Sequence, residues 1–148
     1  MAIPTLFRLH VFATAALFGL IWLVQLVHYP GFHYVDAAQW TAFHAHHTSS
    51  ITPIVLPLMT AELALGGIIW RWSGWDWRFG MLWTLTIGTW VSTFLLSVPL
   101  HNELAGGYHE ATVDALVRTN WPRTALWTIR TVWLFLSYTT LRQLPNRS

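Results

Sequence analysis

Hydrophobic residues dominate four stretches of the chain, and each stretch ends in a short group of polar, proline or glycine residues. The stretches cover about residues 6–27, 51–70, 79–98 and 121–141. Each is about 20 residues long, the length that an α-helix needs to cross ~30 Å of hydrocarbon. The pattern predicts an all-α fold, an integral membrane four-helix bundle in which residues 1–148 form a single domain.

The two longer connectors carry amphipathic patterns of their own. In the first, Asp36 is followed three residues later by Gln39, a capping-box pattern that favours a helix over 36–47. In the second, over about 108–119, hydrophobic residues recur at i, i+3 and i+4 and so share one helical face. We expect both to be amphipathic helices in the connectors that lie against the end of the bundle or against the membrane interface.

Arginine supplies every basic residue, and its distribution predicts an orientation. With four spans, the two termini and the 71–78 loop share one side of the membrane, and the long connectors lie on the other. By the positive-inside rule, the termini face the cytoplasm of a bacterial inner membrane and the connectors face outward. The arginines are Arg8, Arg71, Arg78, Arg142 and Arg147 on the first side, and Arg118 and Arg123 on the second.

Composition narrows the classes of function. Hydrophobic residues make up 54% of the chain and charged residues 9%, too little charge to cover a soluble domain of this size. The basic residues form no stripe, which argues against a nucleic-acid partner. The sequence contains no cysteine, so thiolate metal sites, iron–sulfur clusters and covalently attached haem are excluded. No internal repeat is evident.

Seven of the eight histidines are predicted at the outward end of the bundle, and four of them are candidate metal ligands. Gln25 and His28 share a face at the end of the first span, and His44 and His47 are three residues apart in the first connector. His101 follows the third span. Neutral imidazole binds iron, zinc and copper. A second interpretation, that these histidines are amphipathic residues of the membrane interface, stays open.

Two charged residues lie deep within predicted spans. Glu62 and Arg130 fall at similar depths of the second and fourth spans. A lone charge there costs roughly 2.5–3.5 kcal/mol on insertion scales, so we expect the two to pair. The pair is either purely structural or catalytic. In the catalytic interpretation Glu62 is a further metal ligand or a proton acceptor, and Arg130 holds it in place.

A polar stripe follows one face of the fourth span. Asn120, Arg123, Trp127 and Arg130 are spaced by three, four and three residues, which places them on one side of a helix. In lipid such a stripe should face inward, where its donors find partners. Two arginines near an aromatic ring suit an anionic or quinone-like ligand. We therefore predict substrate-binding roles for Asn120, Arg123 and Trp127, together with Gln25.

Three groups of residues carry a resemblance to known membrane proteins. They are Trp22, Gln25, His28, Tyr29, Pro30 and Phe32; then Phe43, His44, His47, Ile51 and Thr52; then Pro99, Leu100, His101 and Asn102 with Asn120, Trp121, Arg123, Thr124, Trp127 and Arg130. Over most of its length the chain resembles an uncharacterised family of small bacterial four-helix membrane proteins. Its last third is distantly similar to the anthrone-oxygenase-like membrane family. That family shows a proline–asparagine element after its third span and a W-x-R-x-x-x-x-x-x-R-like stretch in its fourth, and it lacks a histidine-rich first connector.

The sequence therefore favours a membrane metalloenzyme. We expect an oxidoreductase with iron, zinc or copper that acts on a lipophilic or aromatic small molecule. Two alternatives stay open: a b-type haem electron-transfer protein with two histidines as axial ligands, and a non-enzymatic accessory subunit or carrier of a lipophilic ligand. The expected partners are the lipid bilayer and the small molecule, and the sequence leaves open a homo-oligomer or a partner membrane subunit.

Overall fold

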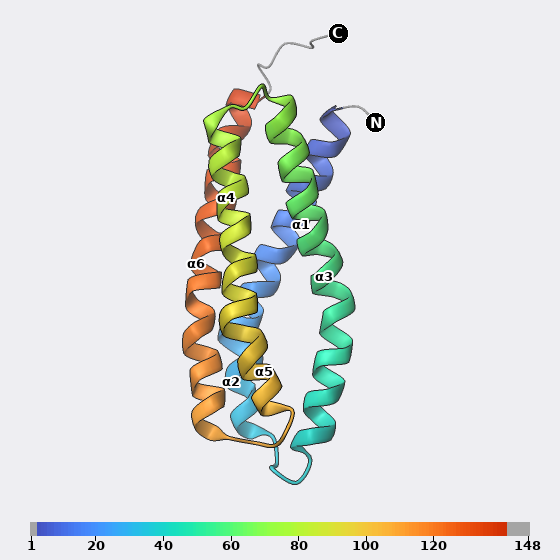
Figure 1. Ribbon diagram of the computed structural model, residues 1–148, viewed down its shortest axis with the longest axis vertical. Helices are drawn as coiled ribbons and strands as arrows, with labels where there is room; N and C mark the ends of the chain where they lie inside the picture. The colour runs from blue at the N-terminus through green and yellow to red at the C-terminus, as the bar shows by residue number, and fades with distance from the viewer. Residues whose placement is uncertain (1–2, 142–148) are drawn as a thin grey trace.

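The computed structural model describes residues 3–141, and within them the chain is helical and contains no strand. There it forms four helical rods that run side by side (Figure 1). The first rod consists of α1 (Ile3–Leu23), η1 (Val24–His28), α2 (Tyr29–Gly31) and η2 (Phe32–Tyr34). The second is α3 (Trp40–Trp72), the third is α4 (Trp77–Ser92), η3 (Thr93–Ser97) and α5 (Val98–Leu104), and the fourth is α6 (Glu110–Leu141). The all-α prediction is confirmed, whereas Arg142, Pro145 and Arg147 lie outside the described residues.

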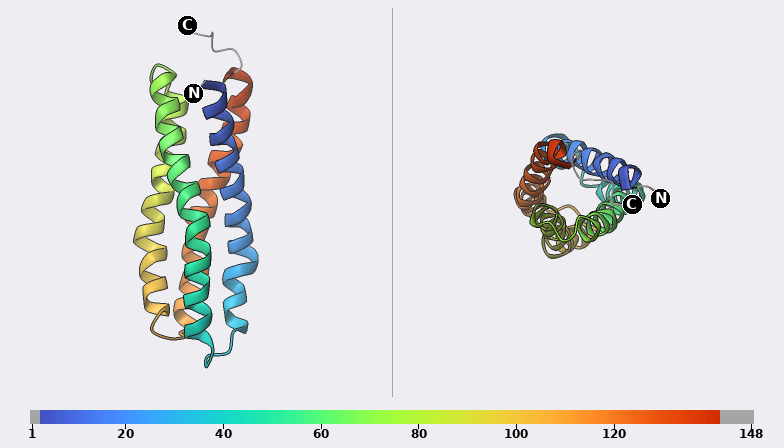
Figure 2. Two further views of the ribbon diagram at one scale, coloured as in Figure 1. Left: turned by 90° about the vertical axis from the view of Figure 1, so that its right-hand side faces the viewer. Right: turned by 90° about the horizontal axis from the view of Figure 1, so that it is seen from above.

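The rods surround a common axis, as the end-on view of Figure 2 shows. Helix α1 packs against α3 and α6, and α4 packs against the same two helices. The start of α1 and the end of α6 lie at one end of the molecule (Figure 1). The opposite end carries the loops between η2 and α3 and between α5 and α6. We call it the histidine end because seven histidines lie on or near it: His28, His33, His44, His46, His47, His101 and His109.

Three of the rods, over the described residues, are long and apolar enough to cross a membrane. Helix α6 is more polar, but it is polar on its inner side. Arg123 and Arg130 are buried against the other helices. Every exposed position between Trp121 and Leu136 is apolar. A helix with apolar residues outside and charged residues inside is favourable in lipid, where buried partners satisfy the charges. The three apolar rods are residues 4–34, 40–72 and 77–104.

The two connector helices predicted as separate elements are instead the first turns of α3 and α6. Helix α3 runs unbroken for 33 residues, about 50 Å, which exceeds the ~30 Å of a hydrocarbon core. The predicted capping box is also wrong. Asp36 Oδ1 accepts a hydrogen bond from the Ala38 backbone N–H at 2.8 Å and so stabilises the turn before the helix. Gln39 is the residue that precedes α3, and its side chain makes no capping hydrogen bond.

The first and third rods are interrupted at corresponding places. Each contains one π-helical turn, η1 or η3, followed two residues later by a proline, Pro30 or Pro99. Pro53 of α3 and Pro122 of α6 also occupy corresponding places, in the second and fourth rods. All three pairs of features lie 69 residues apart along the chain. The fold is therefore a pair of similar helical hairpins, a repeat that the sequence did not reveal. Isolated π turns are frequent at functional sites.

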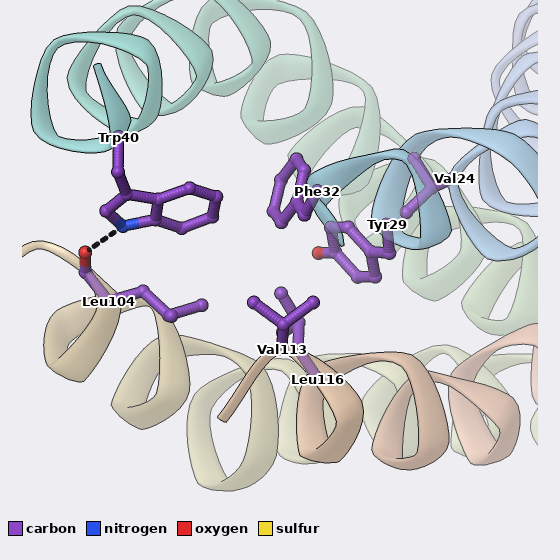
Figure 3. Close-up of a cluster of buried hydrophobic side chains, with 7 residues drawn as sticks. All are labelled: Val24, Tyr29, Phe32, Trp40, Leu104, Val113 and Leu116. Carbon is purple, nitrogen blue, oxygen red and sulfur yellow. Dashed lines mark hydrogen bonds between the residues drawn. The ribbon is translucent and has the colours of Figure 1, made fainter. Parts of the chain in front are cut away.

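A cluster of buried aromatic and aliphatic side chains closes the histidine end (Figure 3). Trp40, at the start of α3, is its largest member, and its indole Nε1 donates to the Leu104 carbonyl at 2.7 Å. This contact ties the second rod to the end of the third. The cluster fixes the positions of the helix ends from which the nearby histidines project. Its members are Val24, Tyr29, Phe32, Trp40, Leu104, Val113 and Leu116.

Candidate functional site

Four histidines from three rods lie close together beside the buried cluster that closes the histidine end. His28 Nε2 lies 2.8 Å from His47 Nδ1, and His44 Nε2 lies 3.1 Å from His101 Nδ1. The two pairs also touch each other, because the ring centroids of His47 and His101 are 5.5 Å apart. These are the four histidines that the sequence analysis selected as metal ligands. The structure brings all four together.

Local sequence explains why these side chains converge. His44 and His47 are three residues apart on α3, so both are buried on the side that faces the other rods. His28 ends the π turn η1, which turns it toward α3. His101 stands two residues after Pro99, in the short helix α5 that follows η3. In contrast, His33, His46 and His109 are exposed, as expected.

A chain of hydrogen bonds leads from the histidines into the protein. His101 Nε2 lies 3.0 Å from the Tyr29 hydroxyl, and Arg123 Nη2 donates to the same hydroxyl at 3.4 Å. Arg123 Nε donates to Asn120 Oδ1 at 3.0 Å. Asn120 Nδ2 donates in turn to Gln25 Oε1 at 2.8 Å. Both ring nitrogens of His101 are engaged, one by His44 and one by Tyr29, so its ring orientation is fixed.

A cavity of about 290 Å³ begins at the histidines and extends along the rods. It lies between α3 and the third rod, with α1 and α6 behind it. Its polar end is formed by Tyr29, His47, His101 and Arg123, and its other walls are largely apolar. Exposed hydrophobic residues at its rim include Leu56, Phe94 and Val98. The apolar lining includes Ile21, Val55, Met59, Trp90 and Trp127.

The predicted substrate-binding residues divide into two groups. Arg123 and Trp127 line the cavity. Gln25 and Asn120 are buried beside it and are hydrogen-bonded to each other, and Gln25 Nε2 also donates to the Val117 carbonyl at 3.1 Å. Neither is part of the cavity wall. The two amides therefore support Arg123 from behind the cavity wall.

Glu62 and Arg130 form the expected pair. Both side chains are fully buried, and Arg130 Nη1 contacts Glu62 Oε1 directly. Arg130 Nη1 also donates to Thr14 Oγ1 at 2.7 Å, and Nε donates to the Leu82 carbonyl at 3.3 Å. Trp127 Nε1 donates to the second carboxylate oxygen of Glu62 at 3.1 Å. The pair thus has hydrogen-bonding partners on α1, α4 and α6.

The structure does not bring Glu62 to the histidines. It lies 15 residues after His47 on the same helix, about 22 Å along the axis. Glu62 is therefore too far away to share a metal ion with them, and its predicted role as a further ligand is corrected. The hydrophobic pattern predicts that this span begins at residue 51, whereas α3 begins eleven residues earlier, at Trp40.

His10 is a buried polar residue whose contacts were not predicted from the sequence. Its Nε2 lies 3.0 Å from Arg130 Nη2, so it joins the ion pair from α1. Its Nδ1 is buried with no hydrogen-bond partner among the described residues. The available signal was the spacing of His10 and Thr14, four residues apart on one face of an apolar helix. Their common partner, Arg130, lies 120 residues away from His10.

Among the described residues, no group of three or more histidine, aspartate or glutamate side chains is arranged so that it could hold a metal ion. Two nitrogens bound to one tetrahedral ion at 2.0–2.1 Å are about 3.3 Å apart. The nitrogen–nitrogen distances within the two pairs, 2.8 and 3.1 Å, are close to that value.

Comparisons of the chain with protein-family models, with curated proteins and with solved structures found no match. The chemistry of the site is therefore inferred from its own residues. These supply two chemical environments side by side: a cluster of imidazoles with a phenol and a guanidinium, and a mainly apolar cavity that begins at the same side chains.

Proposed function

We propose that the chain is a membrane-embedded, metal-dependent oxidoreductase that acts on a lipophilic small molecule. One observation carries the proposal: two of the four clustered histidines, His47 and His101, also line the apolar cavity. A metal held by the cluster would therefore adjoin a molecule held in the cavity. Sites of this kind, largely apolar with a few polar groups at one end, are typical of small-molecule binding.

The proposal includes a four-span topology with both termini in the cytoplasm. The apolar outer face of α6 supports a fourth span, because every residue that α6 exposes between Trp121 and Leu136 is apolar. The arginine distribution supports the orientation. In this orientation the histidine end faces the periplasm of a bacterial inner membrane, which gives a metal ion an aqueous route to the cluster.

The proposed ligands are His28, His44, His47 and His101. An all-imidazole set without thiolate suits iron, copper or zinc, and a redox role selects iron or copper because zinc has no redox chemistry. When bound, such a metal would exchange electrons with the molecule in the cavity. Tyr29 would have the outer role that metal-binding histidines usually require: its hydroxyl engages His101 Nε2, and Nδ1, which contacts His44 in this structure, would bind the metal.

The proposed role of the Glu62–Arg130 pair is to position Trp127. Glu62 does not line the cavity, but it accepts a hydrogen bond from Trp127, which does. The pair therefore holds the indole that forms part of the cavity wall. Glu62 and Arg130 would therefore act on the cavity indirectly, through Trp127, and not in the catalytic role expected from the sequence.

Metal content tests the proposal. The protein is purified in detergent without chelator and analysed by elemental mass spectrometry, beside His44→Ala and His101→Ala. His46→Ala is the matched control, because His46 is exposed on the same helix as His44. Stoichiometric iron or copper in the wild type and in His46→Ala, lost in the other two variants, is the expected result.

Three outcomes would overturn it. Protein that carries no stoichiometric metal, and gains none on titration, would favour a non-enzymatic ligand carrier or accessory subunit. A strong Soret absorption band would indicate a b-type haem protein. Stoichiometric zinc in place of iron or copper would remove the redox assignment.

A further inference from the structure

Among the described residues, Arg123 is a buried cation without an acidic partner. Its side chain is 7% exposed and lines the cavity. Its hydrogen bonds go to neutral groups: the Asn120 amide oxygen, the Thr93 hydroxyl at 3.2 Å and the Tyr29 hydroxyl at 3.4 Å. Within residues 3–141 the only ion pairs are His33 with Asp114 and Arg130 with Glu62.

Arg130, on the same helix, differs from Arg123 in its ionic partner. Arg130 is neutralised by Glu62, whereas Arg123 has hydrogen-bond partners but no counter-charge within residues 3–141. Removing a charge from water costs several kcal/mol, and hydrogen bonds to neutral groups offset only part of that cost. The cavity beside Arg123 is the place where a counter-charge can enter.

The guanidinium also has hydrogen-bonding capacity to spare. It carries five N–H groups, and four contacts to protein atoms engage it. One N–H of Nη1 is therefore free. The contact from Nη2 to Tyr29, at 3.4 Å, is beyond the usual range for such a bond and is easily exchanged. A planar group with two acceptor oxygens can bind along this edge of the guanidinium.

We propose that the cavity binds an amphiphilic carboxylate. Its carboxylate binds Arg123, and its hydrocarbon part lies along Val55, Met59 and Trp90 toward the rim at Phe94. A carboxylate matches the edge of a guanidinium in shape and neutralises it with a single charge. A phosphate monoester is less suitable, because Arg123 is the one cationic side chain besides histidine among the described residues that line the cavity. A quinone carbonyl would leave the arginine charge uncompensated.

This inference rests on the proposed function in one respect: it names the chemical class of the substrate of the proposed oxidoreductase. Tyr29 contacts both Arg123 and His101, so the head group would lie close to the histidine cluster. The carbons next to the carboxylate would then be the ones nearest to a metal. Binding itself requires Arg123 and the cavity and is independent of metal.

Binding of matched probes tests the proposal. The protein is reconstituted in nanodiscs of uncharged lipid at pH 8 and titrated with decanoate or with its methyl ester. Decanoate should bind more tightly than the ester by on the order of tenfold to a hundredfold, as expected for a hydrogen bond between charged groups. Arg123→Gln should remove that preference. Arg118→Gln, at an exposed position of the same helix, should keep it.

Further variants keep the test decisive if Arg123→Gln does not fold. Val55→Trp fills the cavity away from the arginine network and should abolish decanoate binding. His44→Ala should lose metal yet keep the preference for decanoate, which separates this proposal from the metal centre. Equal affinity for the ester and the carboxylate, or undiminished decanoate binding by Val55→Trp, would overturn it.

Discussion

Trp127 and Glu62 connect the cavity to the buried ion pair: the indole Nε1 donates to Glu62 Oε2 at 3.1 Å, and the same indole lines the cavity. Arg130 contacts the other carboxylate oxygen. Both oxygens of Glu62 are therefore engaged. The charge pair holds the Trp127 indole, and with it this part of the cavity wall, in a fixed position. This relationship explains how residues outside the cavity can influence a ligand within it.

Glu62→Gln should destabilise the protein strongly. The change strands the Arg130 charge in a fully buried place, where loss of one partner costs about 3–5 kcal/mol. The double variant Glu62→Gln with Arg130→Met should be more stable than the single variant, because it strands no charge. Thermal unfolding in detergent measures both, with Glu110→Gln at an exposed position as the control. An unchanged melting temperature for Glu62→Gln would contradict the account.

Tyr29→Phe should weaken metal binding without removing any ligand. The hydroxyl orients His101, and loss of such an outer contact typically lowers metal affinity 10–100-fold. Competition with a chelator of known affinity measures the change. Tyr34→Phe is the control, because the Tyr34 side chain is 91% exposed. Identical affinities for the two variants would show that Tyr29 has no role at the site.

Gly66→Ala should destabilise the packing around His10. A Cβ at this position would lie 3.2 Å from His10 Cε1 and 3.3 Å from Trp83 Cδ1. The Trp83 indole is held by a hydrogen bond to the Leu63 carbonyl, so it cannot move away easily. We expect a cost of about 1–3 kcal/mol. Gly19→Ala meets no atom within 4 Å and should leave the melting temperature unchanged or raise it. Equal changes in melting temperature for Gly66→Ala and Gly19→Ala would show that His10 and Trp83 do not approach position 66 closely.

The orientation can be measured with single cysteines, since the chain has none of its own. A cysteine at Ala105, in the loop between α5 and α6, should react with an impermeant maleimide added to intact cells. A cysteine at Ser148 should react only after the membrane is opened. Labelling of position 148 but not 105 from outside would reverse the proposed topology.

Much of the cluster was predictable because helical spacing is a local property. The i, i+3 spacing of His44 and His47 placed both on one face, and the ends of two apolar stretches placed His28 and His101 at the same depth. The pairing of Glu62 with Arg130 followed from the cost of leaving either charge alone in an apolar span.

The rest depended on how the rods pack. Nothing in the residues 24–28 and 93–97 identifies them as π turns, and each turn changes which side chains point inward. The hairpin repeat was hidden because its matching features are π turns and prolines, not shared motifs. His10 reaches Arg130 only because α1 lies against α6. The cavity likewise arises between α3 and the third rod, and no local pattern encodes it.

X-ray absorption at the metal edge tests the central claim most directly, because it reports the atoms bound to the metal. On purified protein we expect a first shell of about four nitrogens with the multiple scattering of imidazole. That signal should be lost when His44 and His101 are both replaced by alanine. An oxygen-dominated shell, or an unchanged spectrum in the double variant, would show that the four histidines are not the metal site.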